Sequence, residues 1–216
     1  MVRPRRASTL LTLSAIALLS GCTGGPTPGP SSPSPEVTRS SEPTASPTAA
    51  TTPSPSPSST TVTVTSIPSC EQILTVQQVV ATVGEDRMTF SGEFDAIPSS
   101  YLPGPVAQST YEKAITAHTC GWGIPESDGL VYVTVALVES AAAEPLIGAL
   151  TNSTEYTRAT LNEMTAFSKA ITTGIGTNLG YAFTGNVWVI VEGTIVSEGT
   201  AIALAAQAAS SVVALR

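Results

Sequence analysis

The sequence predicts an α+β fold for residues 67–216, a single domain in which an antiparallel sheet packs against helices. Alternating apolar runs predict two hairpins, and the clearest strand is residues 130–139. Valines at helical spacing predict a helix at residues 76–83, and an alanine-rich run predicts another at residues 200–215. A segment of roughly 150 residues is long enough to bury one hydrophobic core.

The first helix has recognisable ends in the sequence. Thr75 and Gln78 have the spacing of a capping box, in which the two side chains satisfy free amides of the first turn. Gly84 is the expected stop, because glycine adopts the left-handed conformation that ends many helices. The apolar face of this helix consists of Val76, Val79, Val80 and Val83.

A long loop and a hairpin are expected next. The loop covers residues 92–109 and contains Pro98, Pro103 and Pro105. In the strand that follows, Val131, Val133, Val135 and Leu137 alternate with Tyr132, Thr134 and Ala136. This strand pairs most simply with residues 119–124, since Asp128 and Gly129 supply the chemistry of the turn between them.

The following segments are less regular. Residues 141–150 predict a short helix, in which Pro145 must fall in the first turn or break the helix. Residues 154–172 indicate no single type of secondary structure. The second hairpin joins residues 179–183 to residues 187–191 through a Thr-Gly-Asn turn.

The C-terminal helix is expected to pack closely on the sheet, because one of its faces carries small side chains. That face is predicted to consist of Ile202, Ala206, Ala209 and Val213. The helix is too short, and too interrupted by polar residues, to span a membrane.

The N-terminus, residues 1–21, indicates a secretory signal peptide. Arg3, Arg5 and Arg6 precede an apolar stretch at residues 10–19 that is too short to span a bilayer stably. The paired arginines leave open the twin-arginine export route beside the general secretory one.

The end of this segment, Leu19-Ser20-Gly21-Cys22, resembles the lipobox of bacterial lipoproteins. In that family the cysteine thiol receives a diacylglyceryl group, with acyl chains such as palmitate, and becomes the first residue after cleavage. The resemblance implies a lipid on Cys22, and Leu19, Ser20 and Gly21 as the residues that the signal peptidase recognises. It also implies a domain held at the outer face of the cytoplasmic membrane. The alternative is a spare cysteine beside an ordinary cleavage site.

Residues 22–66 are predicted to be the lipidated cysteine and a disordered linker. Of the 44 residues after Cys22, 10 are Pro, 11 Ser and 11 Thr, and none is Leu, Ile, Phe, Tyr or Trp. Without large apolar side chains the segment cannot bury enough surface to offset its ordering entropy. Such Ser/Thr/Pro stalks are also substrates for O-glycosylation, a question that the sequence leaves open.

The charge of the mature chain limits its partners. Removing residues 1–21 leaves six Lys and Arg against 16 Asp and Glu, a net charge of −10. Nucleic acids and anionic lipid head groups both require a basic surface. We therefore expect no nucleic-acid partner, and membrane contact through the lipid on Cys22 rather than through protein charge.

Cys70 and Cys120 remain once Cys22 is assigned to the lipid. Two cysteines in an exported domain predict a disulfide. A redox pair would have Cys-x-x-Cys spacing, and a metal site would require more ligands, so neither a metal nor another cofactor is expected.

A second resemblance covers the architecture of most of the chain. Cys70-Glu71-Gln72 at the start of a helix, Cys120-Gly121-Trp122 in a strand, and Asn186-Val187-Trp188 in a late strand are similar to small, uncharacterised cell-envelope lipoproteins of actinobacteria. These proteins share the Pro/Ser/Thr-rich linker, the cysteine pair and a C-terminal helix. Because the activities of that family are mostly unknown, the resemblance implies no catalytic residue.

The candidate catalytic residues are few. His118 is the single histidine, and Ser-His-Asp catalysis would also need a Gly-x-Ser-x-Gly motif, which the sequence lacks. Two acidic pairs, Glu126 with Asp128 and Glu85 with Asp86, have the residue types of a glycosidase. Both pairs fall in expected turns, where solvated acidic residues are common, so no catalytic residue is assigned.

The aromatic residues and a glycine-rich stretch offer binding alternatives. Gly174-Ile175-Gly176 lacks the strand and helix of a dinucleotide site and is expected to be a loop. Core packing is the simplest role for the aromatic residues; two or three of them that faced a cleft with residues 92–109 would instead suit an apolar or sugar ligand. The set consists of Tyr101, Tyr111, Trp122, Tyr132, Tyr181, Phe183 and Trp188.

The function expected from these observations is that of a non-enzymatic lipoprotein that binds a ligand or partner at the cell envelope. An envelope protein, a glycan and an apolar molecule are the partner classes left open. A cell-wall hydrolase with an unrecognised carboxylate pair and a purely structural spacer are the alternatives. Sheltered carboxylates in a cleft would favour the hydrolase, an apolar pocket would favour binding, and a closed surface would favour the spacer.

Overall fold

A seven-stranded antiparallel sheet forms the centre of the computed structural model, which describes residues 63–216. The order of its strands is β1-β2-β3-β7-β6-β5-β4. The strands are β1 (Thr89–Phe94), β2 (Thr116–Gly123), β3 (Leu130–Leu137), β4 (Thr157–Leu161), β5 (Met164–Ile171), β6 (Thr177–Thr184) and β7 (Val187–Gly193). The helices of the described residues are α1 (Cys70–Ile73), α2 (Val76–Val83), the 3-10 helix η1 (Ser99–Tyr101), α3 (Pro105–Tyr111), α4 (Ser140–Thr151) and α5 (Glu198–Ala214). The predicted α+β class is confirmed.

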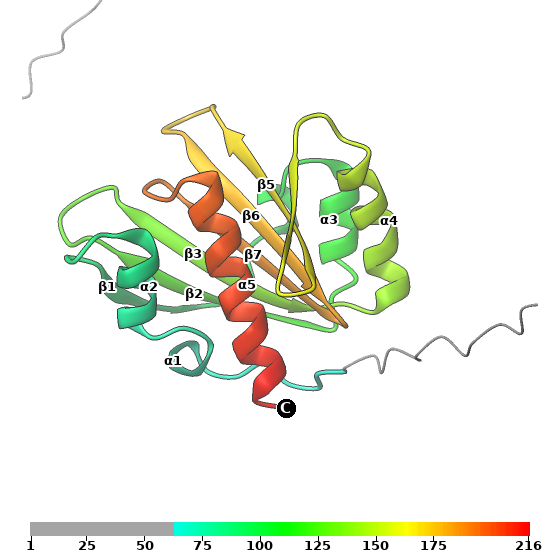
Figure 1. Cartoon of the computed structure of the whole chain (residues 1–216), viewed down its shortest axis with the longest axis horizontal. Coiled ribbons are helices and arrows are strands. Elements are labelled where there is room, and N and C mark those ends of the chain that lie inside the picture. Colours follow the sequence, from blue (N-terminus) through cyan, green and yellow to red (C-terminus); the bar gives the residue numbers. More distant parts are fainter. Residues whose placement is uncertain (1–62) are drawn as a thin grey trace, which may run out of the picture. The chain divides into compact units, whose positions relative to one another are not determined.

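The two faces of the sheet carry separate hydrophobic cores. On the first face, Val131, Val133 and Val135 of β3 pack in one core with side chains of α1, α2 and α5. On the second face, Ala136 and Trp188 pack in another core with side chains of α3 and α4. Figure 1 shows α5 lying across the sheet near α1 and α2, with α3 and α4 grouped apart from them. The predicted alternation of β3 is therefore confirmed.

Four predicted local features are present in the structure. The Thr75 hydroxyl accepts a hydrogen bond from the amide of Gln78 at 3.2 Å, and Gly84 ends α2 with a φ of 78°. The β2–β3 hairpin and the β6–β7 hairpin both pair as expected. These features depend on residues close in sequence, which explains why periodicity and capping chemistry predict them.

Helix α5 packs on the sheet through a different face from the one predicted. Ala206 and Ala209 are buried as expected, but Ile202 and Val213 are only half-buried. The buried face is centred on Ala201, Leu204, Ala205, Ala208 and Val212. The reason is the close approach to β6, where a Cβ atom on Gly180 would lie 2.5 Å from the carbonyl carbon of Ala201. Only small helix residues permit such a contact.

The prediction of a long loop at residues 92–109 is wrong, because this stretch contains regular secondary structure. It includes the end of β1, the 3-10 helix η1 and most of α3. Pro105 is the first residue of α3, a position where its missing amide hydrogen costs nothing. Proline at a helix start, rather than in a loop, explains the misassignment.

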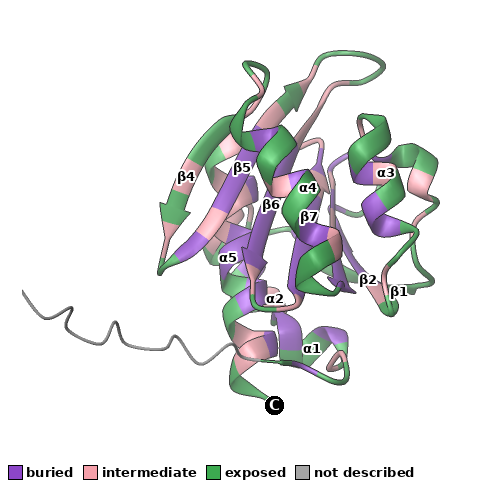
Figure 2. Ribbon diagram, turned by 90° about the vertical axis from the view of Figure 1, so that its right-hand side faces the viewer, coloured by how far each residue is buried: buried purple, intermediate pink, exposed green. Residues whose placement is uncertain are grey.

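Two further segments differ from the sequence-based expectation. Pro145 neither lies in the first turn nor breaks α4, since it is the sixth residue of a continuous 12-residue helix. Both Pro145 and Ala141 are exposed, so the carbonyl that loses its helical partner faces solvent. The unassigned residues 154–172 contain the β4–β5 hairpin, whose turn residues Asn162 and Glu163 have φ of 49° and 66°. Figure 2 shows β4 as a mostly exposed strand at the edge of the sheet.

Residues that precede the predicted domain start at residue 67 also pack against the sheet and helices. Val64 is 3% exposed and belongs to the first core. Its amide donates to Asn186 Oδ1 and its carbonyl accepts from Asn186 Nδ2, each at 2.8 Å. The turn of the β6–β7 hairpin thus holds the incoming segment. The predicted signal peptide, Cys22 and the linker up to residue 62 lie outside the described residues.

Candidate ligand cleft

A cleft lies on the second face of the sheet, beyond the region that α3 and α4 cover. It has a volume of about 440 Å³. On one side are sheet residues from the start of β3 and the end of β7, and on the other is the segment that links β1 to η1. The lining residues are Phe94, Asp95, Ala96, Ile97, Pro98, Tyr101, Thr119, Leu130, Tyr132, Thr134, Ile175, Thr177, Ile190, Glu192, Gly193 and Thr194. The lining is predominantly apolar, and its volume suits a small organic molecule.

One wall of the cleft is an aromatic pair. The rings of Phe94 and Tyr132 meet edge to face, with centroids 5.7 Å apart. They meet above Gly121, where a Cβ atom would lie 2.6 Å from the Phe94 ring and 3.2 Å from the Tyr132 ring. The glycine of the Cys-Gly-Trp sequence therefore provides the space for this wall.

The floor of the cleft contains two threonines that bond to each other. The hydroxyls of Thr119 and Thr134 are 2.9 Å apart, and both residues are 1% exposed. Ile190 lies opposite Thr134 on β7 and continues the floor. Because the two hydroxyls satisfy one another, this part of the floor requires no polar ligand group.

The polar feature of the cleft is a carboxyl group at the end of β7. Glu192 is half-buried, and its burial raises the pKa of the carboxyl, while a hydrogen bond from Thr177 lowers it. The Thr177 hydroxyl donates to Glu192 Oε1 at 3.5 Å. Asp95 also lines the cleft, but it is exposed.

Sequence reasoning missed both Glu192 and Phe94. A signal for Glu192 exists in the sequence, because β7 places Trp188, Ile190 and Glu192 on one face and an acidic residue interrupts that apolar series. No comparable signal exists for Phe94, since its role depends on pairing with Tyr132 from another strand.

The mouth of the cleft carries exposed apolar side chains. Phe94, Tyr101 and Ile175 are 43%, 68% and 78% exposed. Ile175 comes from the Gly174-Ile175-Gly176 stretch, which forms the turn between β5 and β6 and confirms the expected loop. Clustered exposed apolar residues at a pocket are typical of binding surfaces.

The seven aromatic residues divide between the two roles considered for them. Tyr111, Trp122, Tyr181, Phe183 and Trp188 are buried in the cores. Tyr101 and Tyr132 line the cleft together with residues 94–98. Core packing therefore accounts for most of the set, and the cleft accounts for the remaining two.

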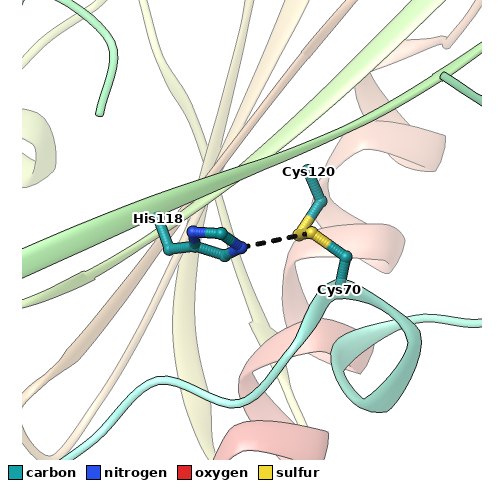
Figure 3. A group of neighbouring side chains, drawn as sticks. All are labelled: Cys70, His118 and Cys120. Carbon is teal, nitrogen blue, oxygen red and sulfur yellow. Dashed lines mark hydrogen bonds between the residues drawn. A yellow bond between two sulfur atoms is a disulfide. The ribbon is translucent and has the colours of Figure 1, made fainter. Parts of the chain in front are cut away.

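The predicted disulfide between Cys70 and Cys120 is present and joins α1 to β2. Figure 3 shows the His118 ring directed at this bond, with Nε2 3.4 Å from Cys70 Sγ. Glu93 Oε2 lies 3.8 Å from the same nitrogen. Among the described residues this is the one place where Cys and His ligand atoms converge, but the two sulfurs are bonded to each other. The arrangement supports a structural role for His118.

The acidic pairs considered from the sequence do not form the cleft. Glu85 bonds through both oxygens to the Arg87 guanidinium, which lowers the pKa of Glu85. Glu126 and Asp128 are exposed in the β2–β3 turn. The structure thus supports the solvated interpretation of both pairs.

Comparisons with known proteins give a likeness to solved structures but no match by sequence. No protein-family model and no curated protein matches the sequence. Among solved structures, the chain is similar to the extracellular domain of PknH from Mycobacterium tuberculosis, with a TM-score of 0.45 and 14% sequence identity. The match covers 65% of this chain and 92% of that one. Within residues 63–216, every helix is too short or too polar to serve as a membrane span.

Proposed function

We propose that the chain is an exported lipoprotein, anchored to the membrane through Cys22, whose domain binds an apolar ligand in the cleft. The observation that supports binding is the apolar cleft itself, with exposed Phe94, Tyr101 and Ile175 at its mouth. An apolar molecule in this space would remove both the lining and the mouth residues from water, which stabilises the complex in proportion to the area buried.

The hydrolase alternative is less well supported by the geometry. Glycoside hydrolysis uses two carboxyl groups that flank the bond to be cleaved. Of the two carboxyl groups that line the cleft, Glu192 is half-buried and Asp95 is exposed. One sheltered carboxyl in an apolar space suits the recognition of a ligand better than paired acid–base chemistry.

Ligand binding is tested with rim variants of the mature chain and a neutral fluorescent probe, N-phenyl-1-naphthylamine. The wild-type chain should raise the fluorescence of the probe. The double variant Tyr101→Asp/Ile175→Asp should bind it about tenfold more weakly, because the probe then loses apolar contact area. Both residues are exposed, so the fold should survive the substitutions.

Ile115→Asp is the matched control for this experiment. Ile115 is 67% exposed, like the rim residues, but it does not line the cleft. This variant should bind the probe as the wild type does. Equal binding by all three chains, or an equal loss in both variants, would contradict the cleft as the binding site.

The lipid anchor is tested separately in intact cells. The support for it is the Leu19-Ser20-Gly21-Cys22 pattern followed by a Pro/Ser/Thr-rich stretch. Cys22→Ser should abolish labelling by a fatty-acid analogue and release the protein from membranes. Undiminished labelling of this variant would overturn the anchor and leave the cleft proposal intact.

A further inference from the structure

The charges around the cleft all have the same sign. Glu192 and Asp95 are its charged lining residues. Residues 63–216 contain five Lys and Arg residues, and none of them lines the cleft: Arg87, Lys113, Arg158, Lys169 and Arg216. His118 faces the disulfide on the opposite face of the sheet. An anionic group inside the cleft would therefore have no side-chain cation to pair with and would lie near a carboxylate.

Glu192 lies near the end of β7, the central strand of the sheet, and its carboxylate can accept further hydrogen bonds. It lies opposite Tyr132 on β3 and opposite Leu179 on β6. The hydrogen bond that the described residues donate to its carboxylate, from Thr177, is 3.5 Å long. This length is at the limit for a hydroxyl donor, whereas an ionised carboxylate offers about four acceptor positions.

We propose that the cleft selects apolar molecules whose polar end is a hydrogen-bond donor, an alcohol or an amine, and rejects those that end in a carboxylate or phosphate. Glu192 accepts the hydrogen bond from the donor, and the apolar body lies against Ile97, Ile190 and the Phe94–Tyr132 pair. This selection rests on the proposed function, since it specifies the chemistry of the molecule that the cleft holds.

The energetic reason is the cost of burying charge without a partner. A carboxylate or phosphate placed near Glu192 loses hydration and gains only repulsion. An alcohol supplies the carboxylate with a donor at no cost in charge burial. An amine supplies a charge-assisted hydrogen bond, which is shorter and stronger than a neutral one.

The environment of Glu192 agrees with this selection. Burial raises the pKa of its carboxyl, so the site already disfavours negative charge before a ligand enters. The other titratable groups at the cleft are Asp95, Tyr101 and Tyr132, and the buried Tyr181 of β6 lies near Glu192 on the same face. None of these groups is a cation that would offset an anionic ligand.

The test uses decanol, decylamine and decanoate as competitors of N-phenyl-1-naphthylamine on the wild-type mature chain. The three share one hydrocarbon chain and differ in the head group. Decanol and decylamine should displace the probe, and decanoate should require at least about tenfold higher concentration, as expected for a like charge near a partly buried carboxylate. In Glu192→Gln the concentration ratio of decanoate to decanol needed for displacement should fall by about threefold or more, because the repulsion by the Glu192 carboxylate is gone while the cost of dehydrating decanoate remains.

Glu144→Gln is the matched control, since Glu144 is exposed on α4 and does not line the cleft. It should keep the wild-type order of competitors. If all three compounds displace the probe equally from the wild type, the head-group selection is wrong while the proposed binding function stands. If the probe itself does not bind, or none of the three displaces it, the proposed function fails first. An unchanged concentration ratio of decanoate to decanol in Glu192→Gln would assign the selection to another group.

Discussion

Glu192 is the residue on which the chemistry of the cleft depends, because it is a half-buried acid at the end of an apolar strand. Trp188 and Ile190 precede it on the same face of β7, so a residue of this face would ordinarily be apolar. A polar side chain kept at a sheltered position costs stability unless it is well bonded. Because Glu192 lowers the stability of the fold, we infer that it serves ligand binding rather than folding.

Glu192 should therefore make the stability of the wild type depend on pH. Because its pKa is raised in the folded state, the fold binds this proton more tightly than the unfolded chain does. The stabilisation is complete at pH values below the pKa that Glu192 has in the unfolded chain. It is lost as pH rises through the pKa that Glu192 has in the folded chain. Glu192→Gln removes the effect. The free energy of unfolding of the variant should therefore increase relative to that of the wild type as pH rises from about 4 to about 7.

Urea denaturation at a series of pH values measures this difference. Glu144→Gln, at an exposed position outside the cleft, serves again as the control for an acid-to-amide change elsewhere on the domain. Curves for Glu192→Gln that run parallel to those of the wild type would contradict the raised pKa. If the wild type instead lost stability relative to Glu192→Gln as pH falls, the Glu192 carboxylate would be stabilised by a partner in the folded state.

At the scale of elements, the contact between α5 and β6 determines how the first core is closed. Gly180 has no side chain, and the backbone of Ala201 and Ile202 occupies the space where one would be. The alanines of α5 let the helix lie on the sheet at this distance, and Leu204 and Val212 extend the contact into the core. The small residues of the helix and the glycine of the strand therefore act together.

Gly180→Ala should destabilise the domain by about 1–3 kcal/mol, because the added methyl group meets helix backbone that can yield only if α5 moves. Gly148→Ala is the matched control. Gly148 lies in α4 with open space around its Cβ position, so alanine should stabilise the helix by about 1 kcal/mol. Urea denaturation of the two variants compares these opposite signs. Gly180→Ala with unchanged stability would show that α5 is not held at this distance.

At the scale of the whole described domain, two long-range connections hold its N-terminal part. The disulfide joins α1 to β2 across 50 residues of sequence. The second connection is the pair of hydrogen bonds between Val64 and Asn186, which are 122 residues apart. Both connections tie the beginning of the folded chain to the sheet.

Removing the disulfide should lower the free energy of unfolding by about 4 kcal/mol, the value that the chain-entropy relation gives for a loop of this length. The double variant Cys70→Ser/Cys120→Ser tests this in urea. Intact-mass analysis of the wild type should show two hydrogens fewer than the reduced chain. Two freely alkylated thiols in native material, or a double variant as stable as the wild type, would contradict the prediction.

The start of the domain is tested by two truncations. A chain that begins at residue 63 should melt as the full mature chain does. A chain that begins at residue 67 should lose about 2 kcal/mol, because it lacks the buried Val64 and leaves Asn186 unpaired. Equal melting temperatures for the two truncated chains would place the effective start at residue 67.

Signals that lie within a few residues of one another were sufficient to predict much of this domain. The capping of α2 by Thr75, the stop at Gly84 and the alternation of β3 are local, so the sequence alone determines them. The disulfide was predictable for a different reason, since only Cys70 and Cys120 remain as partners once Cys22 is set aside.

Other features depend on contacts that no local pattern records. The β4–β5 hairpin turns through Asn162 and Glu163 without a glycine, and Pro145 is tolerated because its side of α4 faces solvent.

The cleft is the clearest case of a feature that only the tertiary structure decided. The sequence contains the parts of the cleft, namely a set of aromatic residues and a segment with three prolines at residues 92–109. It does not show that these parts lie together. Phe94, Tyr132 and Glu192 lie on three different strands, and they share one space because β1, β2, β3 and β7 are neighbours in the sheet. Hydrophobic periodicity determines which residues face a core, whereas strand order determines which of them face each other, and strand order is fixed by long-range packing.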